Sequence, residues 1–457
     1  MKALHAVSVF TAALCAAGIP LRAQEPQQPP VRQSGTILAV SHDTLASVAS
    51  AVQVAGGKVY VNDILAHQVL LYDSTLGAAQ LIADSAGETA NPYGSMPATL
   101  LPYHGDSALL VTPSSLSMLV LGPAGATTHI LAMPPSGVGT LPSLIGSIFG
   151  TPGFDAHGRL TYFSPVRMQF RGPPPTNGPM AMEPPDSALI VRFDLATRAL
   201  DTAGTIHIPR SHMSVSRDDQ GHMHMTMTAF PPQPVDAWAV TSDGAIAIVR
   251  GLDFHIDWIN PDGSRTSSGR IPFAWQHLDD DQKTALIDSV QGVMQAFMDS
   301  MPARMQRQNG QAGGTAQTRE QRGPGGGGSM TVIIAGPGGG DAPPPGGPGR
   351  GAPGNGTTTI SMATPTVEKA SPADVPDYRP PFEQGAVRAD ADGNLWIRTS
   401  TMVDGRPVYD VVNRVGQLVD RVQLPPFRTI AGFGPGVLYM AVKDSTGTAH
   451  VERARIR

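Results

Sequence analysis

Three histidines lie close together in the chain and could bind a metal ion through their imidazole rings: His212, His222 and His224. His222 and His224 are two positions apart, so on a β-strand both would lie on one face, where two imidazoles can share a metal. Methionines alternate with them and would lie on the other face, and a mixed His and Met donor set suits copper. The favoured interpretation is a half-buried strand with Met in the core and His in solvent, because the sequence places no third ligand.

Four further polar residues lie near the ends of predicted inner hairpins: Asn62, Asp63, His104 and Asp155. If these hairpins surround a central channel, the side chains could reach it and hold a divalent metal. The favoured interpretation of each is a polar residue of a solvated turn. The cofactor therefore stays unknown, with a divalent metal as the one candidate.

Other motifs favour structural roles. Asp390–Asn394 (D-A-D-G-N) resembles part of a calcium loop, but its Gly comes too early and no bidentate Glu follows, so an Asp-Gly hairpin turn is favoured. No G-x-S-x-G is present, and the Gly-rich segment lacks the Lys of a phosphate-binding loop. The four tryptophans are predicted to pack between strands: Trp238, Trp258, Trp275 and Trp396.

Charge and the N-terminus limit the compartment and the partners. The net charge of -5 over 457 residues, without a basic stripe, argues against a nucleic-acid partner. Lys2 followed by an apolar stretch to Ile19 predicts a signal peptide over residues 1–23. We therefore expect a secreted or periplasmic protein, without a membrane span once the signal is removed. Cys15 is the only cysteine, so the mature chain would contain no disulfide.

A recurring hairpin predicts the fold. Apolar strand, Gly turn and alternating strand occur at Val52–Asp63, Ala239–Arg250 and Ala386–Arg398. One such hairpin cannot bury its apolar face alone, but a ring of them can. The prediction is an all-β, six-bladed β-propeller, with seven blades as the alternative, in which strands near 36–40 and 451–456 share one blade. Ser214–Ala229 is interpreted as an elaborated outer edge of the third blade.

An insertion interrupts the propeller. The predicted order is a signal peptide (1–23), a disordered spacer (24–33), a first propeller part (34–273), a helical insertion (274–308), a largely disordered Gly/Pro-rich linker (309–380) and a last propeller part (381–457). A helix is expected from Asp279, capped by its first aspartates and ended or kinked by Pro302. Its packed stripe is predicted at three- and four-residue steps: Leu286, Val290, Val293, Phe297 and Met301.

The stretches Asp236–Gly263, Gly385–Arg398 and Tyr409–Pro425 resemble the secreted six-bladed β-propellers of the NHL and TolB-like group. The resemblance implies a fold rather than an activity, and the helix plus Gly/Pro tract departs from a minimal propeller. The leading hypothesis is an exported scaffold that binds a protein, peptide or glycan with one axial face. The alternative is a metal-dependent hydrolase or lyase that uses the central channel, as propeller enzymes of the lactonase and amidating-lyase types do.

Overall fold

The computed structural model describes residues 28–104, 106–135, 144, 150–164, 180–182, 185–217, 223–311, 318–322, 328–334, 358–363 and 365–457. The predicted signal peptide, the first residues of the spacer and most of the Gly/Pro-rich tract lie outside the described residues. None of the helices in the described ranges has both the length and the apolar character needed to cross a bilayer.

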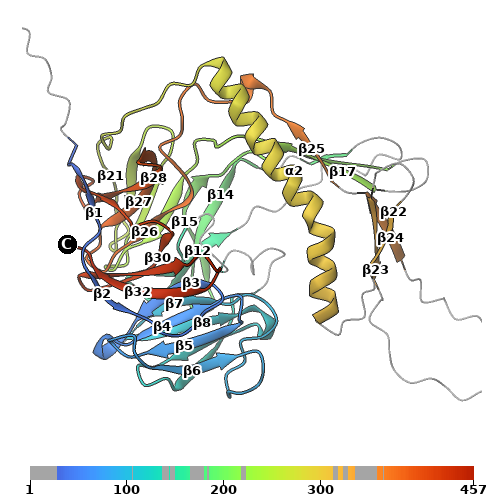
Figure 1. Cartoon of the computed structure of the whole chain (residues 1–457). Helices are drawn as coiled ribbons and strands as arrows, with labels where there is room; N and C mark the ends of the chain where they lie inside the picture. Colours follow the sequence, from blue (N-terminus) through green and yellow to red (C-terminus); the bar gives the residue numbers. More distant parts are fainter. Residues whose placement is uncertain are drawn as a thin grey trace, which may run out of the picture.

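The described strands form six antiparallel sheets built from consecutive hairpins, plus a seventh sheet (Figure 1). The first is β3(Val48–Gln53), β4(Val59–Asp63), β5(Gln68–Tyr72) and β6(Ala79–Asp84), and the second is β7(Thr99–Tyr103), β8(Ser107–Thr112), β9(Ser117–Leu121) and β10(Thr127–Ala132). The third is β11(Gly153–Phe154), β12(Leu160–Ser164), β14(Ser187–Phe193) and β15(Leu200–His207), and the fourth is β18(Ala237–Val240), β19(Ile246–Arg250), β20(His255–Ile259) and β21(Arg265–Ser267).

The last two sheets of this series contain the C-terminal strands. The fifth consists of β26(Phe382–Ala389), β27(Leu395–Val403), β28(Arg406–Val412) and β29(Leu418–Gln423), with β1(Val31–Gln33) added in parallel at its edge. The sixth consists of β30(Arg428–Gly434), β31(Val437–Lys443), β32(Ala449–Arg455) and β2(Ile37–Val40). The pairing of β2 with β32 places Ile37 opposite Ala454. The prediction that strands from both ends of the chain share one sheet is therefore confirmed.

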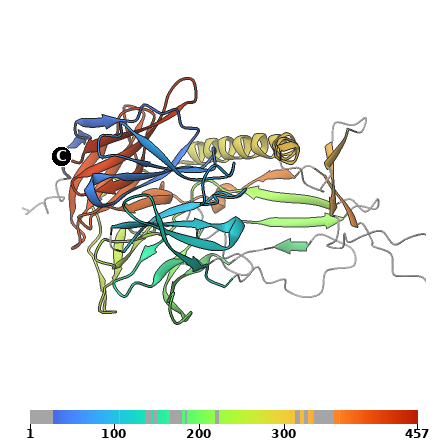
Figure 2. The same ribbon diagram turned by 90° about the horizontal axis from the view of Figure 1, so that it is seen from below.

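The first strands of the six sheets lie next to one another. Strand β3 contacts β30 and β7, β7 contacts β11, β11 contacts β18, and β18 contacts β26. Each sheet buries its faces against its neighbours, with apolar clusters between successive sheets, and Figure 2 shows the sheets grouped on one side of the molecule. This arrangement of short antiparallel sheets side by side is a β-propeller.

The inner hairpins turn on aspartate and glycine. Asp155 and Asp390 each accept hydrogen bonds from backbone N–H groups two and four residues later, which holds the turn. Gly158 and Gly393 follow with φ of +75° and +80°, a conformation in which glycine carries no Cβ penalty. Asp390–Asn394 therefore forms the predicted hairpin turn.

Three of the four tryptophans pack between strands as predicted. Trp238, Trp258 and Trp396 are buried, and Trp396 also donates its Nε1–H to Asp390 at 3.1 Å. Trp275 differs, since 40% of it is exposed. It lies where the chain leaves the fourth sheet for the insertion and packs edge-on against Phe273.

The seventh sheet corrects one prediction. Ser214–Ala229 is not the outer edge of the third sheet, which ends at β15. It forms the hairpin of β16(Met213–Arg217) and β17(Met223–Ala229), and β17 pairs in parallel with β25(Thr366–Lys369). The rest of this sheet consists of β13(Met180–Met182), β22(Thr318–Arg322), β23(Gly328–Ile334) and β24(Thr358–Ala363). Figure 1 shows these strands projecting away from the propeller.

The helix of the insertion, α2, spans Asp280–Gln311 and runs beside the seventh sheet (Figure 1). Asp279 accepts the N–H of Gln282 at 2.8 Å while the Gln282 side chain accepts the N–H of Asp279, so the expected cap is a reciprocal capping box. The helix continues past Pro302 and does not end there.

The predicted apolar stripe of the helix is partly wrong. Ile287 and Met298 are buried and Val290 is half-buried, whereas Val293 is 71% exposed and Phe297 46% exposed. Residues 287, 294 and 298 lie within a narrow arc of a helix with 3.6 residues per turn, while residue 293 lies well around the circumference. The helix therefore packs through one narrow row, against Val367 of β25 and Val375.

Besides β22, β23 and β24, two further segments assigned to disorder contain defined structure. Residues 31–33 of the spacer form β1(Val31–Gln33), which pairs in parallel with β29, and Arg32 Nε donates to Asp420 at 2.8 Å. Residues 365–380 of the linker contain β25 and the short helix η3(Pro372–Asp374), and Leu278 N–H donates to the Asp377 carbonyl. Both segments have ordinary side chains that can pair, unlike the Gly/Pro repeats beside them.

Gly292 offers a direct test of the helix. It lies exposed within α2, and a Cβ added there would meet no atom within 4 Å. Gly292→Ala should therefore stabilise the helix by about 1 kcal/mol, since alanine loses less backbone entropy. We expect a higher thermal midpoint of the helical circular dichroism signal, and a lower midpoint would contradict the placement of this residue in an open helical surface.

Candidate functional site

A cavity of about 570 Å³ lies where the six inner strands meet. We call it the axial cup. Its lining comes from β3, β7, β11, β18, β26 and β30 and from the hairpin turns that follow them. Because every sheet of the series contributes its inner strand, side chains from all six can approach a common ligand here.

Glycines set the width of the cup. A Cβ on Gly432 of β30 would lie 1.9 Å from the carbonyl oxygen of Ala51 on β3, and one on Gly434 would lie equally close to the side chain of Gln53. Tyr439 donates its hydroxyl to Gln53 Oε1 at 2.8 Å across the same boundary. The absence of side chains at Gly432 and Gly434 therefore allows the first and last inner strands to approach closely.

Three of the four carboxylates that line the cup are engaged by other side chains, and the fourth, Asp106, is exposed. Asp155 forms an ion pair with Arg159 at 2.7 Å. Asp243 forms one with Arg414 at 3.2 Å, and Asp390 accepts from Trp396. These interactions satisfy the negative charges within the wall.

Arg388 brings a guanidinium to the wall of the cup. It follows Val387 on β26 and pairs across the ladder with Trp396, on the face of the fifth sheet that also bears Arg398 and Tyr409. Burial lowers the pKa of Arg388 from its ordinary value, and the charge of Arg398 acts in the same direction. Arginine nevertheless stays protonated in proteins, so this is a partly desolvated positive charge.

Aromatic rings form one side of the cup. The ring of Phe154 packs edge-on against Tyr103 at 4.9 Å and lies 5.3 Å from His104. All three residues line the cup, opposite the Gly-rich segment of β30. The cup therefore combines one guanidinium with an apolar wall, which suits a ligand that has an anionic group and an apolar body.

Two predicted channel residues lie away from the cup. Asn62 and Asp63 are buried on β4, the second strand of its sheet. Asn62 donates to the Ala98 carbonyl at 2.9 Å and accepts from the Tyr93 hydroxyl at 2.8 Å. Asp63 accepts the N–H groups of two residues of the chain preceding β3. These bonds fix the first sheet and direct both side chains away from a channel ligand.

The other two predicted channel residues line the cup. His104 is exposed at the end of β7, and Asp155 begins the hairpin turn after β11. The carboxylate of Asp155 is taken up by Arg159 and by its own turn, so Asp155 serves the turn.

Two of the three histidines proposed for a metal site, His212 and His224, lie in the described part of the chain. His212 precedes β16 and its carbonyl accepts from Thr228, whereas His224 on β17 pairs with Ser216. Four ladder positions separate their backbone positions, roughly 13 Å at the rise of a strand. His222 lies outside the described residues. The described part of the chain contains no group of three His, Cys, Asp or Glu residues arranged to bind a metal ion.

Sequence reasoning missed Arg388. In the segment A-V-R-A-D-A-D-G, Arg388 lies between apolar residues, and this alternation predicts a side chain that faces solvent on a strand. The one available signal was its position on an inner strand, two residues before the Asp of a hairpin turn.

No family model matches the chain, and no curated protein matches it. Among solved structures, a virginiamycin B lyase from Staphylococcus aureus bound to quinupristin is 10% identical over 92% of this chain and 99% of that chain, with a TM-score of 0.35. Regucalcin, a calcium-binding protein from Agrobacterium tumefaciens, is 10% identical over 93% and 96%, with a TM-score of 0.31. The β-propeller domain of Cps50 (Swd1) from Myceliophteria thermophila is 9% identical over 92% and 99%, with a TM-score of 0.33. Matches at this level assign no activity to the chain.

Proposed function

We propose that the chain is an exported, six-bladed β-propeller that acts as a binding scaffold and takes an anionic group of its ligand into the axial cup. The observation that carries the proposal is Arg388, a partly desolvated guanidinium in a cup where three of the four lining carboxylates, those of Asp155, Asp243 and Asp390, are already engaged. An incoming carboxylate would meet a charge-assisted donor there, because these three acids already bind other groups.

Export and the blade number belong to the same proposal. The N-terminal sequence, with Lys2 before an apolar stretch, supports removal of residues 1–23 and a secreted or periplasmic location. The six consecutive sheets around the axial cup support six blades, with β2 and β32 closing the ring.

The ligand class follows from the lining. The lining of the cup contains one arginine, Arg388, and the aromatic ring of Phe154. It therefore suits the free C-terminal carboxylate of a peptide whose last side chain is apolar. An extended peptide end is also narrow enough for a cup enclosed by close inner strands.

The test compares two fluorescently labelled peptides, Gly-Ala-Leu with a free carboxyl terminus and the same tripeptide with an amidated terminus. We expect wild-type protein to bind the free form at least about tenfold more tightly, the value of one charge-assisted hydrogen bond. Arg388→Gln should abolish this preference, and Arg388→Lys should keep part of it.

The control is Arg192→Gln on β14, which removes an arginine of comparable size whose ion pair with Asp201 lies outside the cup. It should leave the preference for the free carboxylate unchanged. Equal binding of both peptides by wild-type protein, or an unchanged preference in a folded Arg388→Gln variant, would overturn the proposal.

A further inference from the structure

A second cavity, of about 870 Å³, lies between the propeller and the insertion. We call it the side groove. The propeller contributes the turn between β19 and β20 and the connection from β15 to β18, and the insertion contributes residues 373–376 around η3. The groove is separate from the axial cup and shares no lining residue with it.

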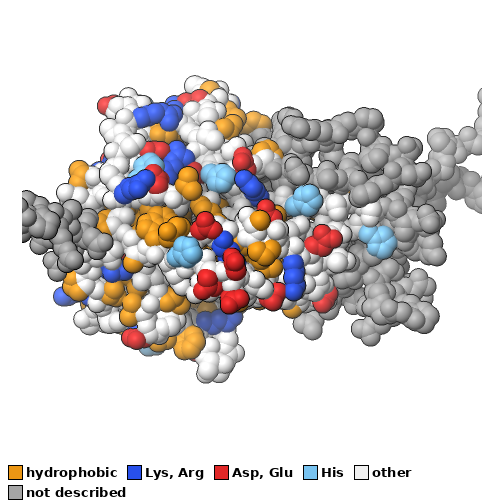
Figure 3. All heavy atoms as spheres, turned by 90° about the horizontal axis from the view of Figure 1, so that it is seen from above, with side chains coloured by type: hydrophobic (Ala, Val, Ile, Leu, Met, Phe, Trp, Pro, Cys, Tyr) orange, Lys and Arg blue, Asp and Glu red, His pale blue; other side chains and the backbone are white. Residues whose placement is uncertain are grey.

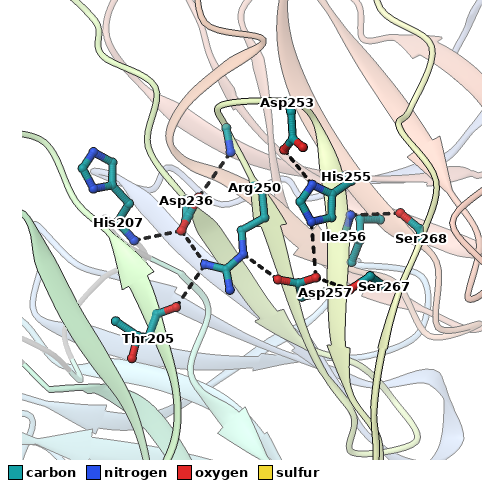
Figure 4. A network of polar contacts seen from close by, with 11 residues as sticks. Thr205, His207, Asp236, Arg250, Asp253, His255, Ile256, Asp257, Ser267 and Ser268 are labelled. Atoms are coloured by element: carbon teal, nitrogen blue, oxygen red, sulfur yellow. Dashed lines mark hydrogen bonds and ion pairs between the residues drawn. The ribbon is translucent and has the colours of Figure 1, made fainter.

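The floor of the side groove is a network of paired charges (Figure 4). Arg250 donates from Nη1 to Asp236 at 2.6 Å and from Nε to Asp257 at 2.8 Å. His255 bridges Asp253 and Asp257, with Nδ1 2.6 Å from the first carboxylate and Nε2 3.3 Å from the second. Although burial acts against it, bonding to Asp257 and Asp236 raises the pKa of Arg250, so this guanidinium is committed to the floor.

The rim of the groove carries charge that the floor does not use. Arg210, Arg270 and Asp374 are exposed in its lining, and among the described residues neither guanidinium forms an ion pair. In the same lining, the turn after β19 presents Leu252, which is 79% exposed. Two arginines and an exposed apolar side chain in one groove match a segment that contains acidic and apolar residues.

The wider surface does not compete with this local match. On the face in Figure 3, several acidic side chains gather near the centre and basic and histidine side chains lie around them, so no extended run of cations covers it. A nucleic acid, which needs an extended run of cations, fits such a face poorly. Recognition must then come from individually placed charges within the groove.

We propose that the side groove is a docking site for an extended acidic peptide segment of a partner protein. Two carboxylates of the segment pair with Arg210 and Arg270, and an apolar side chain between them packs on Leu252. Because one wall belongs to the insertion, the bound segment also contacts both parts of the molecule.

The test uses the full chain and a fluorescein-labelled peptide of alternating Glu and Leu, measured by fluorescence anisotropy. We expect saturable binding that weakens with added salt. Arg210→Glu with Arg270→Glu should weaken it at least about tenfold, because two attractive contacts become repulsive. Leu252→Ser should weaken binding without changing its salt dependence.

The matched control is Lys443→Glu, which reverses an exposed cation at the end of β31, outside the groove. It should bind the acidic peptide like the wild type, and the thermal midpoint of each variant shows that it is folded. Absence of saturable binding up to about 1 mM overturns the proposal, as does equal binding of a Lys-Leu peptide or of a single-stranded oligonucleotide. An unchanged affinity in the folded double variant overturns it as well.

Discussion

Replacing Gly432 by alanine is expected to lower the free energy of unfolding by about 3 kcal/mol or more. The new Cβ would lie 1.9 Å from the carbonyl oxygen of Ala51, and that oxygen belongs to the backbone of the adjacent sheet and cannot rotate away. Strands β30 and β3 would have to separate, which loosens the contact between the sixth and first sheets. Urea unfolding followed by tryptophan fluorescence measures the loss.

Gly436 supplies the matched control on the same hairpin. Its φ of +65° disfavours alanine, but an added Cβ would meet nothing within 4 Å. Gly436→Ala should therefore cost only the backbone strain of the left-handed conformation, about 1 kcal/mol. Equal losses in the two variants would show that crowding between β30 and β3 does not limit stability.

Asp410 is expected to make stability depend on pH in the direction opposite to that of most carboxylates. Burial raises the pKa of Asp410 to about 6, although Arg421 lies 3.2 Å away and acts to lower it. In the unfolded chain an aspartate titrates near pH 3.9. The folded state therefore binds the proton more tightly, and the resulting stability, present below pH 4, is lost as pH rises through about 6.

The difference between these pKa values corresponds to about 3 kcal/mol. Asp410→Asn imitates the protonated acid at every pH. The stability of the wild type relative to this variant should therefore fall by about that amount between pH 4 and pH 7. Other carboxylates titrate alike in both proteins, so the comparison isolates Asp410. A difference that stays constant over this range would contradict the assignment.

Local patterns predicted the units of the fold well. The Asp-Gly turns at Asp390 and the alternation around Trp396 are properties of consecutive residues, and both follow from hydrogen bonding within one hairpin. The pairing of β2 with β32 could be predicted too. In a closed ring of sheets, the sheet that contains the last strands of the chain can be completed by the first strand, which removes a free sheet edge.

Interactions between distant segments were harder to predict. Strand β17 pairs with β25 more than a hundred residues later, across a Gly/Pro-rich tract, and nothing in either segment indicates its partner. The exposure of Val293 was missed for a related reason. Periodicity shows that a helix has an apolar face, but it does not show how much of that face the neighbouring elements cover.

The candidate site was predicted only in part. Asn62 and Asp63 were placed near a channel because they end a hairpin, but the second strand of a hairpin lies one strand further from the axis. Arg388 was missed because its environment is created by six strands together. Fold-level patterns thus predicted where a site would lie better than which side chains would form it.

The parallel attachment of β1 and the antiparallel attachment of β2 have a consequence during synthesis. Arg32 donates to the carbonyl of Ile456, a contact between residues separated by 424 positions. The first strands to leave the ribosome, β1 and β2, therefore stay unpaired until β29 and β32 have been synthesised. A nonsense codon that removed only β32 would leave β2 without a partner strand and one edge of β31 unpaired, so a loss of a few terminal residues should promote aggregation as strongly as a much larger truncation.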